Sequence, residues 1–337
     1  MSKPHNLILA RLAAERARLL RELIGIDRQT LETVPVFADW TAANLLAHIG
    51  DYDLLFVERF QKALQGQEIA SISDDSTPDD PLKKRNAELH ARIKDWSLER
   101  SLEYFSDART QFLDVLAQVS DKDLKRTRQV SWGETSLFEW TRWRWRHDAG
   151  HAEDFRRWRK TLQHDDVPGA KSLLLAALAA ARRDFIASAA LVHASERKTR
   201  HVCGTWTLKD VYGHMADWDV YFYSKACAIL GSEYHELNWH PDWRVSNEKL
   251  VQARRTQSWQ QIIPDFNNAF RNLLTTLKTA DEETITRPYN GSKSPYPTLY
   301  HCAWSALEHY LDHAAVIRKE LPVRVPKRLW VFAGPYT

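Results

Sequence analysis

Two pairs of histidines at a spacing of four residues could chelate metal ions. His147 and His151 form one pair, and His309 and His313 form the other. On a helix, residues four apart lie one above the other on the same face, so two imidazoles at this spacing can share one cation. A single pair would be weak evidence, because the chain contains 14 histidines. A second pair at a matching place in a repeat is stronger evidence.

The sequence is repeated within the chain. Residues 7–16, LILARLAAER, match residues 173–182, LLLAALAAAR, and the same shift of 166 residues places His48 on His214. Near the end of each copy the shift is 162 residues and brings the two histidine pairs into register. Small changes of shift indicate insertions or deletions in loops, where chains tolerate them. We interpret the chain as a tandem duplication and call its halves copy 1 and copy 2.

The duplication selects three histidines in each copy. They are His48, His147 and His151 in copy 1, and His214, His309 and His313 in copy 2. Three protein ligands are typical of a catalytic metal site with an open position. One ligand comes from the second helix of each copy and two come from the fourth, and helices of a bundle can direct such ligands to one point. Neutral imidazole suits Zn, Ni, Fe or Cu, which leaves the metal open.

Two other interpretations of these histidines stay open. They could be buried, hydrogen-bonded side chains kept for packing, or only one copy could bind metal. Three positions kept in register in two diverged copies favour metal sites in both.

Asp51 and Asp217 are candidate catalytic residues, because each lies three residues after the histidine of the second helix and shares its face. Either could orient an imidazole or act as a general base. Each could equally be a solvated or interhelix carboxylate. The fourth helices lack HExxH, since Asp148 and Tyr310 follow the first histidine, so the glutamate base of zincin proteases is missing.

Apolar residues at helical spacing predict four helices in each copy. Thr41 and Thr207 are good N-caps for the second helix. The remaining predicted starts are about Asn86 and about Val245 for the third helix, and Ser136 and Thr298 for the fourth. Alternation with period two is short, so strands are minor at most. The sequence predicts an all-α fold of two tandem four-helix bundles.

The predicted domains are 1–164 for copy 1 and 169–322 for copy 2, with an extended tail at 323–337. Residues 163–169 form a polar, turn-rich seam. Long irregular connections are predicted at 71–81 and 239–243.

Aromatic residues near the histidines have two possible roles. Tyr52 and Trp218 match each other and could wall a pocket, although core packing is favoured. The segment with Trp140, Trp143 and Trp145 carries interleaved arginines, but those arginines spread over more than one helix face and copy 2 lacks the pattern. A core or interface role is favoured there over nucleic-acid binding.

Composition excludes several function classes. The formal charge of +3 with dispersed basic residues gives no support for binding nucleic acid or a membrane surface. No apolar run is long enough to span a bilayer, and the N-terminus lacks a signal peptide. Cys203, Cys227 and Cys302 show no CxxC spacing, which favours free thiols in a cytoplasmic setting. Serine or cysteine triads and Gly-rich phosphate loops have no supporting motif.

The order and spacing of these motifs resemble the DinB-like superfamily. Each copy has Trp-Thr-x6-His at the start of its second helix, then His-x3-His in its fourth helix, as in the whole four-helix domain of that family. The matched Asn86 and Asn247, with the aromatic residue after the second-helix histidine, also resemble the ClbS/DfsB branch. The resemblance covers most of the chain, and the tandem arrangement is a departure from the usual single domain.

The resemblance implies one divalent metal per copy on the six histidines, commonly Zn or Ni, with Fe or Mn as alternatives. Relatives include S-transferases that use low-molecular-weight thiols, a maleylpyruvate isomerase type and metal-dependent hydrolases. Such proteins often pair as dimers, so the chain is expected to be a monomer acting as an internal pseudo-dimer, or a dimer. The leading hypothesis is a thiol S-transferase or hydrolase acting on a small electrophile. The alternative is a non-catalytic protein that sequesters a small molecule, with structural or vestigial metal sites.

Overall fold

The computed structural model describes residues 3–67, 69, 81–130, 133–162, 168–233, 240, 242–291 and 294–321. The tail predicted at 323–337, most of the seam, most of the connection at 71–81 and part of the connection at 239–243 lie outside the described residues.

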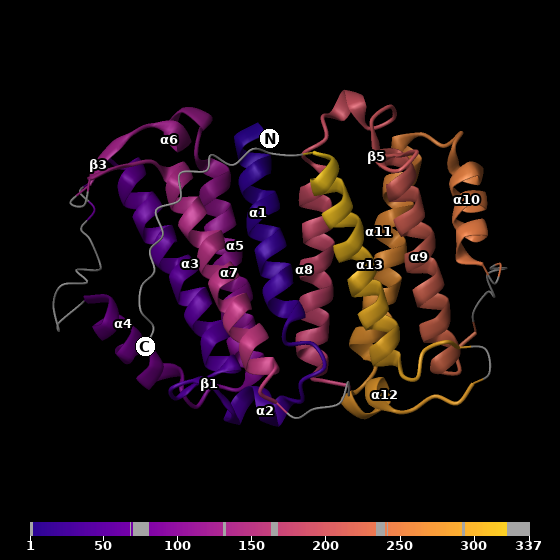
Figure 1. Ribbon diagram of the computed structural model, residues 1–337, viewed down its shortest axis with the longest axis horizontal. Coiled ribbons are helices and arrows are strands. Elements are labelled where there is room, and N and C mark those ends of the chain that lie inside the picture. Colours follow the sequence, from indigo (N-terminus) through magenta and orange to yellow (C-terminus); the bar gives the residue numbers. More distant parts are fainter. Residues whose placement is uncertain are drawn as a thin grey trace.

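Four long helices build each copy, which confirms the predicted all-α fold of two tandem bundles (Figure 1). In copy 1 they are α1 (Lys3–Arg21), α3 (Ala42–Leu64), α5 (Leu98–Gln118) and α7 (Leu137–Arg159). In copy 2 they are α8 (Lys171–Ala189), α9 (Leu208–Ile229), α11 (Trp259–Thr279) and α13 (Leu299–Glu320).

The predicted N-caps start the helices that carry the histidines. The Thr41 side chain accepts a hydrogen bond from Asn44 N at the start of α3, and Thr207 does the same for Asp210 N at the start of α9. Both are capping boxes, in which the side chain at the third helical position bonds back to the cap. Ser136 and Thr298 cap α7 and α13 by accepting hydrogen bonds from Glu139 N and His301 N. These caps set the axial position at which each histidine stands.

The predicted third helix is two helices in each copy. The starts near Asn86 and Val245 fall in α4 (Pro81–Ile93) and α10 (Trp243–Arg254), while α5 and α11 supply the third helix of each bundle. New N-caps cause the break: Ser97 accepts from Arg100 N and Ser258 accepts from Gln261 N. In Figure 1, α10 lies at the outer side of copy 2, beside α9.

The remaining described elements are short. The short helices are α2 (Arg28–Thr33), α6 (Asp121–Lys125), α12 (Glu282–Thr286) and a 3-10 turn at Ala194–Glu196. The strands are β1 (Pro35–Phe37), β2 (Trp40–Thr41), β3 (Arg128–Val130), β4 (Gly133–Thr135), β5 (His201–Cys203) and β6 (Trp206–Thr207), which pair as antiparallel hairpins β1–β2, β3–β4 and β5–β6. Pro35 lies opposite Thr41, and His201 opposite Thr207, so a hairpin leads into each histidine-bearing second helix.

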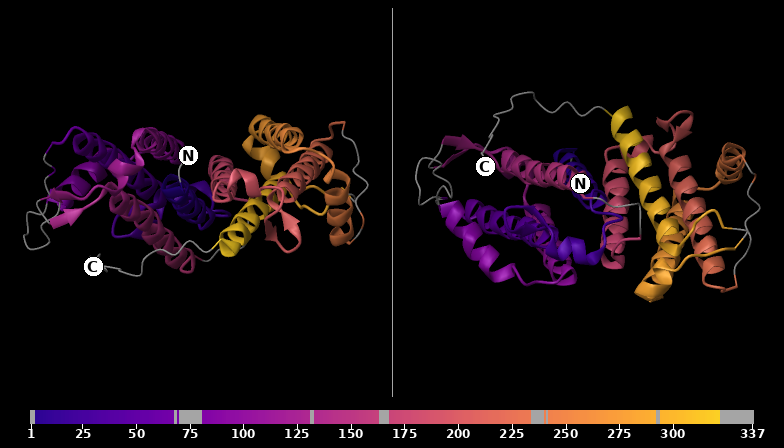
Figure 2. Two further views of the ribbon diagram at one scale, coloured as in Figure 1. Left: turned by 90° about the horizontal axis from the view of Figure 1, so that it is seen from above. Right: turned by 60° about the horizontal axis from the view of Figure 1, so that its bottom comes forward.

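The two copies pack against each other through their first helices. Within copy 1, α1 packs on α7 and α3 on α5; within copy 2, α8 packs on α13 and α9 on α11. Helices α1 and α8 lie side by side in the middle of the molecule (Figure 1), and the view from above separates the two groups of helices on either side (Figure 2). One apolar cluster crosses this contact and includes Leu20 and Leu23 with Leu173 and Ala177.

Specific contacts hold the chain where copy 2 begins. The Tyr300 hydroxyl accepts a hydrogen bond of 3.0 Å from the buried Gly25 N. A Cβ at Gly169 would lie 2.6 Å from the carbonyl oxygen of Ile26, so only glycine lets the chain pass this closely to copy 1. The copies therefore form one packed unit. No helix in the described part of the chain has both the length and the apolarity to cross a bilayer.

Candidate metal centres

The three predicted histidines of copy 1 come together between α3 and α7. The ring centroid of His48 lies 5.1 Å from that of His147 and 5.3 Å from that of His151, and the two α7 rings are 4.6 Å apart. One nitrogen from each ring falls within 4.8 Å of the others. Three nitrogens bound tetrahedrally to Zn²⁺ would lie about 3.3 Å apart, so the rings need to move inward by about 1 Å.

Copy 2 repeats this arrangement between α9 and α13. The His214 centroid lies 5.0 Å from His309 and 4.9 Å from His313, and the two α13 rings are 4.8 Å apart. The Nε2 atoms of His214 and His309 face each other at 3.0 Å. The sequence prediction that each trio gathers at one point is confirmed, and each trio could hold a metal ion.

Burial keeps these imidazoles in the neutral form that binds metals. It lowers the pKa of His48, His147, His214 and His309 well below the usual range, and neighbouring histidines of the same trio lower each of them further. Burial also lowers the pKa of His313 to about 4. Because a ligating histidine must be unprotonated, this environment favours cation binding over protonation.

Unpaired ring nitrogens show that the donor set fits a metal. Within the described residues, both nitrogens of His147 are buried without a hydrogen-bond partner, as are the Nδ1 atoms of His48, His214 and His313. Buried polar atoms are normally satisfied, and leaving one unsatisfied costs about 1–3 kcal/mol. A cation at the centre of the copy 1 trio would give His147 a partner through one of its two ring nitrogens.

An outer carboxylate supports the site in copy 1 alone. Asp154 Oδ2 lies 3.1 Å from His151 Nδ1, which leaves the Nε2 atom of that ring for the cation. Val316 holds the matching position in copy 2. This contact orients one ligand of the first trio and has no equivalent at that position in the second.

Aromatic rings enclose both trios. Tyr52 stacks on His147 with centroids 4.1 Å apart, and Trp40 meets the His48 ring edge-on at 5.4 Å. In copy 2, Trp206 lies 4.8 Å from His214, and Trp218 lies 5.1 Å from His309. The predicted core role for Trp218 is only part of its role, since it also lines a pocket.

The candidate catalytic aspartates point to the outer helices. Asp51 accepts hydrogen bonds from Arg85 at 2.5 Å, Arg92 at 3.3 Å and the Tyr104 hydroxyl at 3.2 Å. Asp217 accepts from Arg254 at 2.8 and 3.0 Å, and burial raises its pKa. These contacts tie α4 to α3 and α10 to α9. A catalytic role for either aspartate stays a prediction.

A buried ion network in copy 1 was missed by sequence reasoning. It comprises Arg16, Asp53, Arg109, Arg144 and Asp148, all less than a tenth exposed. Asp53 accepts hydrogen bonds from Arg16 at 2.7 Å, Arg109 at 2.9 Å and Arg144 at 2.8 Å. Burial alone would raise the pKa of Asp53, but the three guanidinium groups hold it below its usual range. The available signal was that Asp53 matches Asp219 in the repeat.

Copy 2 keeps one aspartate and one arginine of this network and has uncharged residues at its other three positions. At the position matching Asp53, Asp219 accepts a short hydrogen bond from the Tyr310 hydroxyl. Burial raises the pKa of Asp219 to about 7. Arg182, which matches Arg16, lies over the rings of Phe266 and Phe270, each 4.3 Å from its guanidinium carbon.

The tryptophan-rich segment of α7 packs inside copy 1. Trp140 and Trp145 are buried in an apolar cluster with Phe60 and Phe112, and Trp143 packs against it. Arg144, between two of these tryptophans, belongs to the buried ion network. The core role favoured from the sequence is confirmed for these tryptophans.

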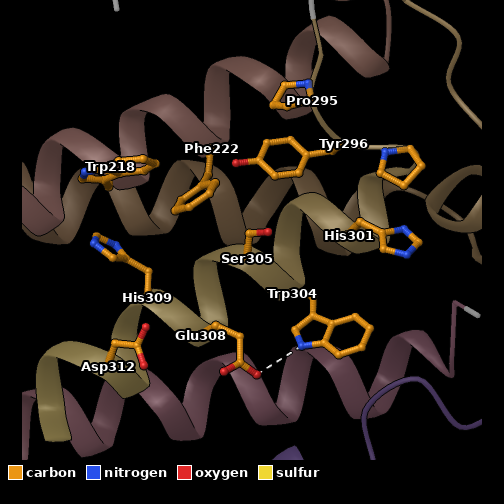
Figure 3. A pocket seen from close by; sticks show the side chains of 11 residues that line it. Trp218, Phe222, Pro295, Tyr296, His301, Trp304, Ser305, Glu308, His309 and Asp312 are labelled. Atoms are coloured by element: carbon orange, nitrogen blue, oxygen red, sulfur yellow. Dashed lines mark hydrogen bonds between the residues drawn. The ribbon is translucent and has the colours of Figure 1, made fainter. Parts of the chain in front are cut away.

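An open pocket of about 570 Å³ borders the copy 2 trio (Figure 3). His309 and Trp218 line one end of it, and the rest of its wall comes from α9, α13 and the turn before α13. A small molecule in this pocket would reach the edge of the metal centre.

Comparison with known proteins identifies one family. A family model described as the DinB superfamily matches residues 11–155 and again residues 177–317. Each match contains one histidine trio. No curated protein and no solved structure gives a significant match.

Proposed function

The chain belongs to the DinB superfamily, and we propose that it is a metal-dependent enzyme that transfers a thiol or water to a small electrophilic molecule. One divalent cation per copy would be held by His48, His147 and His151 in copy 1, and by His214, His309 and His313 in copy 2. A cation held by three imidazoles with positions open lowers the pKa of a thiol or water and makes it a nucleophile at neutral pH.

The observation that carries this proposal is the convergence of three imidazoles twice in one chain. Each trio brings one nitrogen per ring within 4.8 Å of the others, and several of its buried nitrogens have no partner within the described residues. Packing alone would not favour three buried imidazoles, several of them with an unsatisfied nitrogen, gathered at two equivalent places.

The other residues near each trio act by positioning. The N-caps Thr41 and Thr207 set where the second-helix histidine stands, and the carboxylate of Asp154 orients His151. Asp51 and Asp217 hold the outer helices against α3 and α9. We propose that these two aspartates support the site through those helices. The variants Asp51→Asn and Asp217→Asn test the other possibility, that either aspartate acts directly as a base.

Element analysis of the purified chain tests the metal. We expect close to two divalent ions per chain, falling to about one in His147→Ala and in His309→Ala. His201→Ala is the matched control, because His201 is exposed on β5 and belongs to neither trio. Two ions in every variant, or none in the wild type, would contradict the proposal. The same measurement identifies the element among Zn, Ni, Fe and Mn.

Turnover separates the enzyme from a sequestering protein. We expect metal removal by a chelator to abolish thiol transfer or hydrolysis while the helical signal in circular dichroism persists. If chelation melts the bundles and no turnover is found with metal-loaded protein, the ion is structural and the sequestering alternative is favoured.

A further inference from the structure

The pocket beside the copy 2 trio has walls that select for a particular kind of ligand. Four aromatic rings line it, from Trp218 and Phe222 on α9, Tyr296 in the turn before α13, and Trp304 on α13. Figure 3 shows Tyr296 and Phe222 on one side of the pocket and Trp304 on the other, with Ser305 between them. Aromatic faces carry negative quadrupole charge and attract cations within about 6 Å of the ring centre.

Two carboxylates stand on the α13 side of this pocket. Glu308 accepts hydrogen bonds from the Arg21 Nε atom of copy 1 at 2.7 Å and from the Trp304 indole at 3.2 Å (Figure 3). Asp312 is exposed and has no ion-pair or hydrogen-bond partner within the described residues. Burial and, next, the charge of Glu308 raise the pKa of Asp312.

Among the positive groups near the pocket, the charge of Arg21 lowers the pKa of Asp312, but no ion pair joins the two side chains within the described residues. Arg21 is already bound by both oxygens of Glu308. His301 lies at the opposite end of the pocket from His309 (Figure 3), and its Nδ1 atom lies 2.7 Å from the Thr298 hydroxyl. The wall next to the metal centre thus combines aromatic faces with one carboxylate that has no ion-pair partner within the described residues.

Copy 1 has neither the acidic nor the aromatic residues of this wall at the matching positions of α7. Arg146 matches Glu308, Gly150 matches Asp312 and Arg142 matches Trp304. The acidic and aromatic wall is therefore a property of copy 2 and not of the domain in general.

We propose that the copy 2 pocket binds a compact organic cation, a quaternary ammonium or protonated amine, next to the metal centre. The cationic group lies among the aromatic rings near Asp312, and the rest of the ligand extends toward His309. This inference deepens the proposed function by naming the charge and size of the ligand at one site. It rests on the proposed function only for the reaction at the metal, and binding of the cation does not depend on it.

A pair of isosteric probes tests the proposal on the metal-loaded full chain. Choline and 3,3-dimethylbutan-1-ol have the same shape and hydroxyl group, and only choline is charged. We expect calorimetry to show choline binding about tenfold more tightly, which is within the range of desolvated cation–π contacts. Equal affinity for the two probes, or preference for the neutral one, would overturn the proposal.

Asp312→Asn locates the binding in this pocket. It should reduce the choline preference about threefold or more, whereas Asp107→Asn, an equal charge change at an exposed position of α5, should leave it unchanged. Trp304→Leu is a second variant and should also reduce the preference for choline. With two variants, the test still works if one of them folds poorly. A preference that both pocket variants retain places the cation elsewhere and contradicts the assignment.

Metal content of the same samples separates this proposal from the proposed function. A sample with two ions per chain and no preference for choline would reject the cation pocket and leave the metal-dependent function standing. A sample that prefers choline but contains no metal would support the cation pocket and reject the metal-dependent function.

Discussion

Asp53 and Asp219 hold equivalent places beneath the two histidine trios, each five residues after the trio's second-helix histidine. Three guanidinium groups surround Asp53 and hold its pKa below the usual range. A tyrosine hydroxyl and aromatic rings surround Asp219, whose pKa burial raises to about 7. One position thus carries a charged carboxylate in copy 1 and a carboxyl that is protonated up to near neutral pH in copy 2.

The difference shows which part of the duplicated domain is constrained. The trios match in all three ligands and in geometry, while the groups that support them were replaced together. Arg109, Arg144 and Asp148 of copy 1 correspond to Phe270, Ala306 and Tyr310 of copy 2. A buried ion pair and a well-packed neutral core can have similar net stability, so such a replacement is tolerated when it is complete. A partial replacement leaves an unpaired buried charge.

Removing one member of the copy 1 network should have the largest effect. Arg144→Met removes one of the three guanidinium groups that Asp53 and Asp148 share in a site that excludes water, and we expect it to destabilise the chain by about 3–5 kcal/mol. Urea unfolding followed by tryptophan fluorescence measures this. Arg142→Met, on the same helix and outside the network, is the control and should stay within about 0.5 kcal/mol of wild type. A similar small effect from both would show that the network is energetically unimportant.

The two equivalent aspartates should give opposite pH dependences. Folded Asp219 keeps its proton up to about pH 7, whereas an unfolded aspartate releases it near pH 4. Its contribution to stability therefore falls as pH rises through this window, by on the order of 4 kcal/mol. Asp53, with its lowered pKa, contributes stability that is present above about pH 4 and lost as the pH falls below it.

Unfolding free energies of Asp219→Asn and wild type between pH 4 and pH 8 test this. Their difference isolates the Asp219 proton, because the histidines titrate in both proteins. Parallel pH profiles would mean that the Asp219 pKa is not raised.

Transplanting the neutral core into copy 1 should recover stability. The variant Arg109→Phe, Arg144→Ala, Asp148→Tyr reproduces the copy 2 pattern and leaves Arg16 and Asp53 in place. We expect it to be more stable than Arg144→Ala alone by about 2 kcal/mol, since it removes charges together with their partners. If the triple variant loses as much unfolding free energy as the three single variants lose in sum, the groups do not act as a network.

The smallest expected effect concerns the outer carboxylate present in copy 1. Asp154→Asn removes the charge that orients His151, and we expect the copy 1 metal affinity to fall about tenfold, with the copy 2 affinity unchanged. Competition with a graded series of chelators, read by ions retained per chain, measures both sites. Asp107→Asn serves again as the charge control.

Local sequence determined the fold class and the composition of each trio. Helical spacing of apolar residues, N-cap threonines and the i, i+4 histidine pairs depend on neighbours along the chain, and the repeat distinguished the six ligand candidates from the other histidines. The division of the predicted third helix was the local error, because the caps at Ser97 and Ser258 were overlooked.

Only the tertiary structure decided what surrounds the trios. Arg16 contacts Asp148, which lies 132 residues away in the sequence, and Arg21 of copy 1 contacts Glu308 of copy 2, which lies 287 residues away. Such contacts depend on which helix faces meet, and a charged residue in an amphipathic pattern gives no sign of whether it will be solvated or buried against a partner. The direction of Asp51 and Asp217 toward arginines, and the pocket beside His309, arise from helix packing for the same reason.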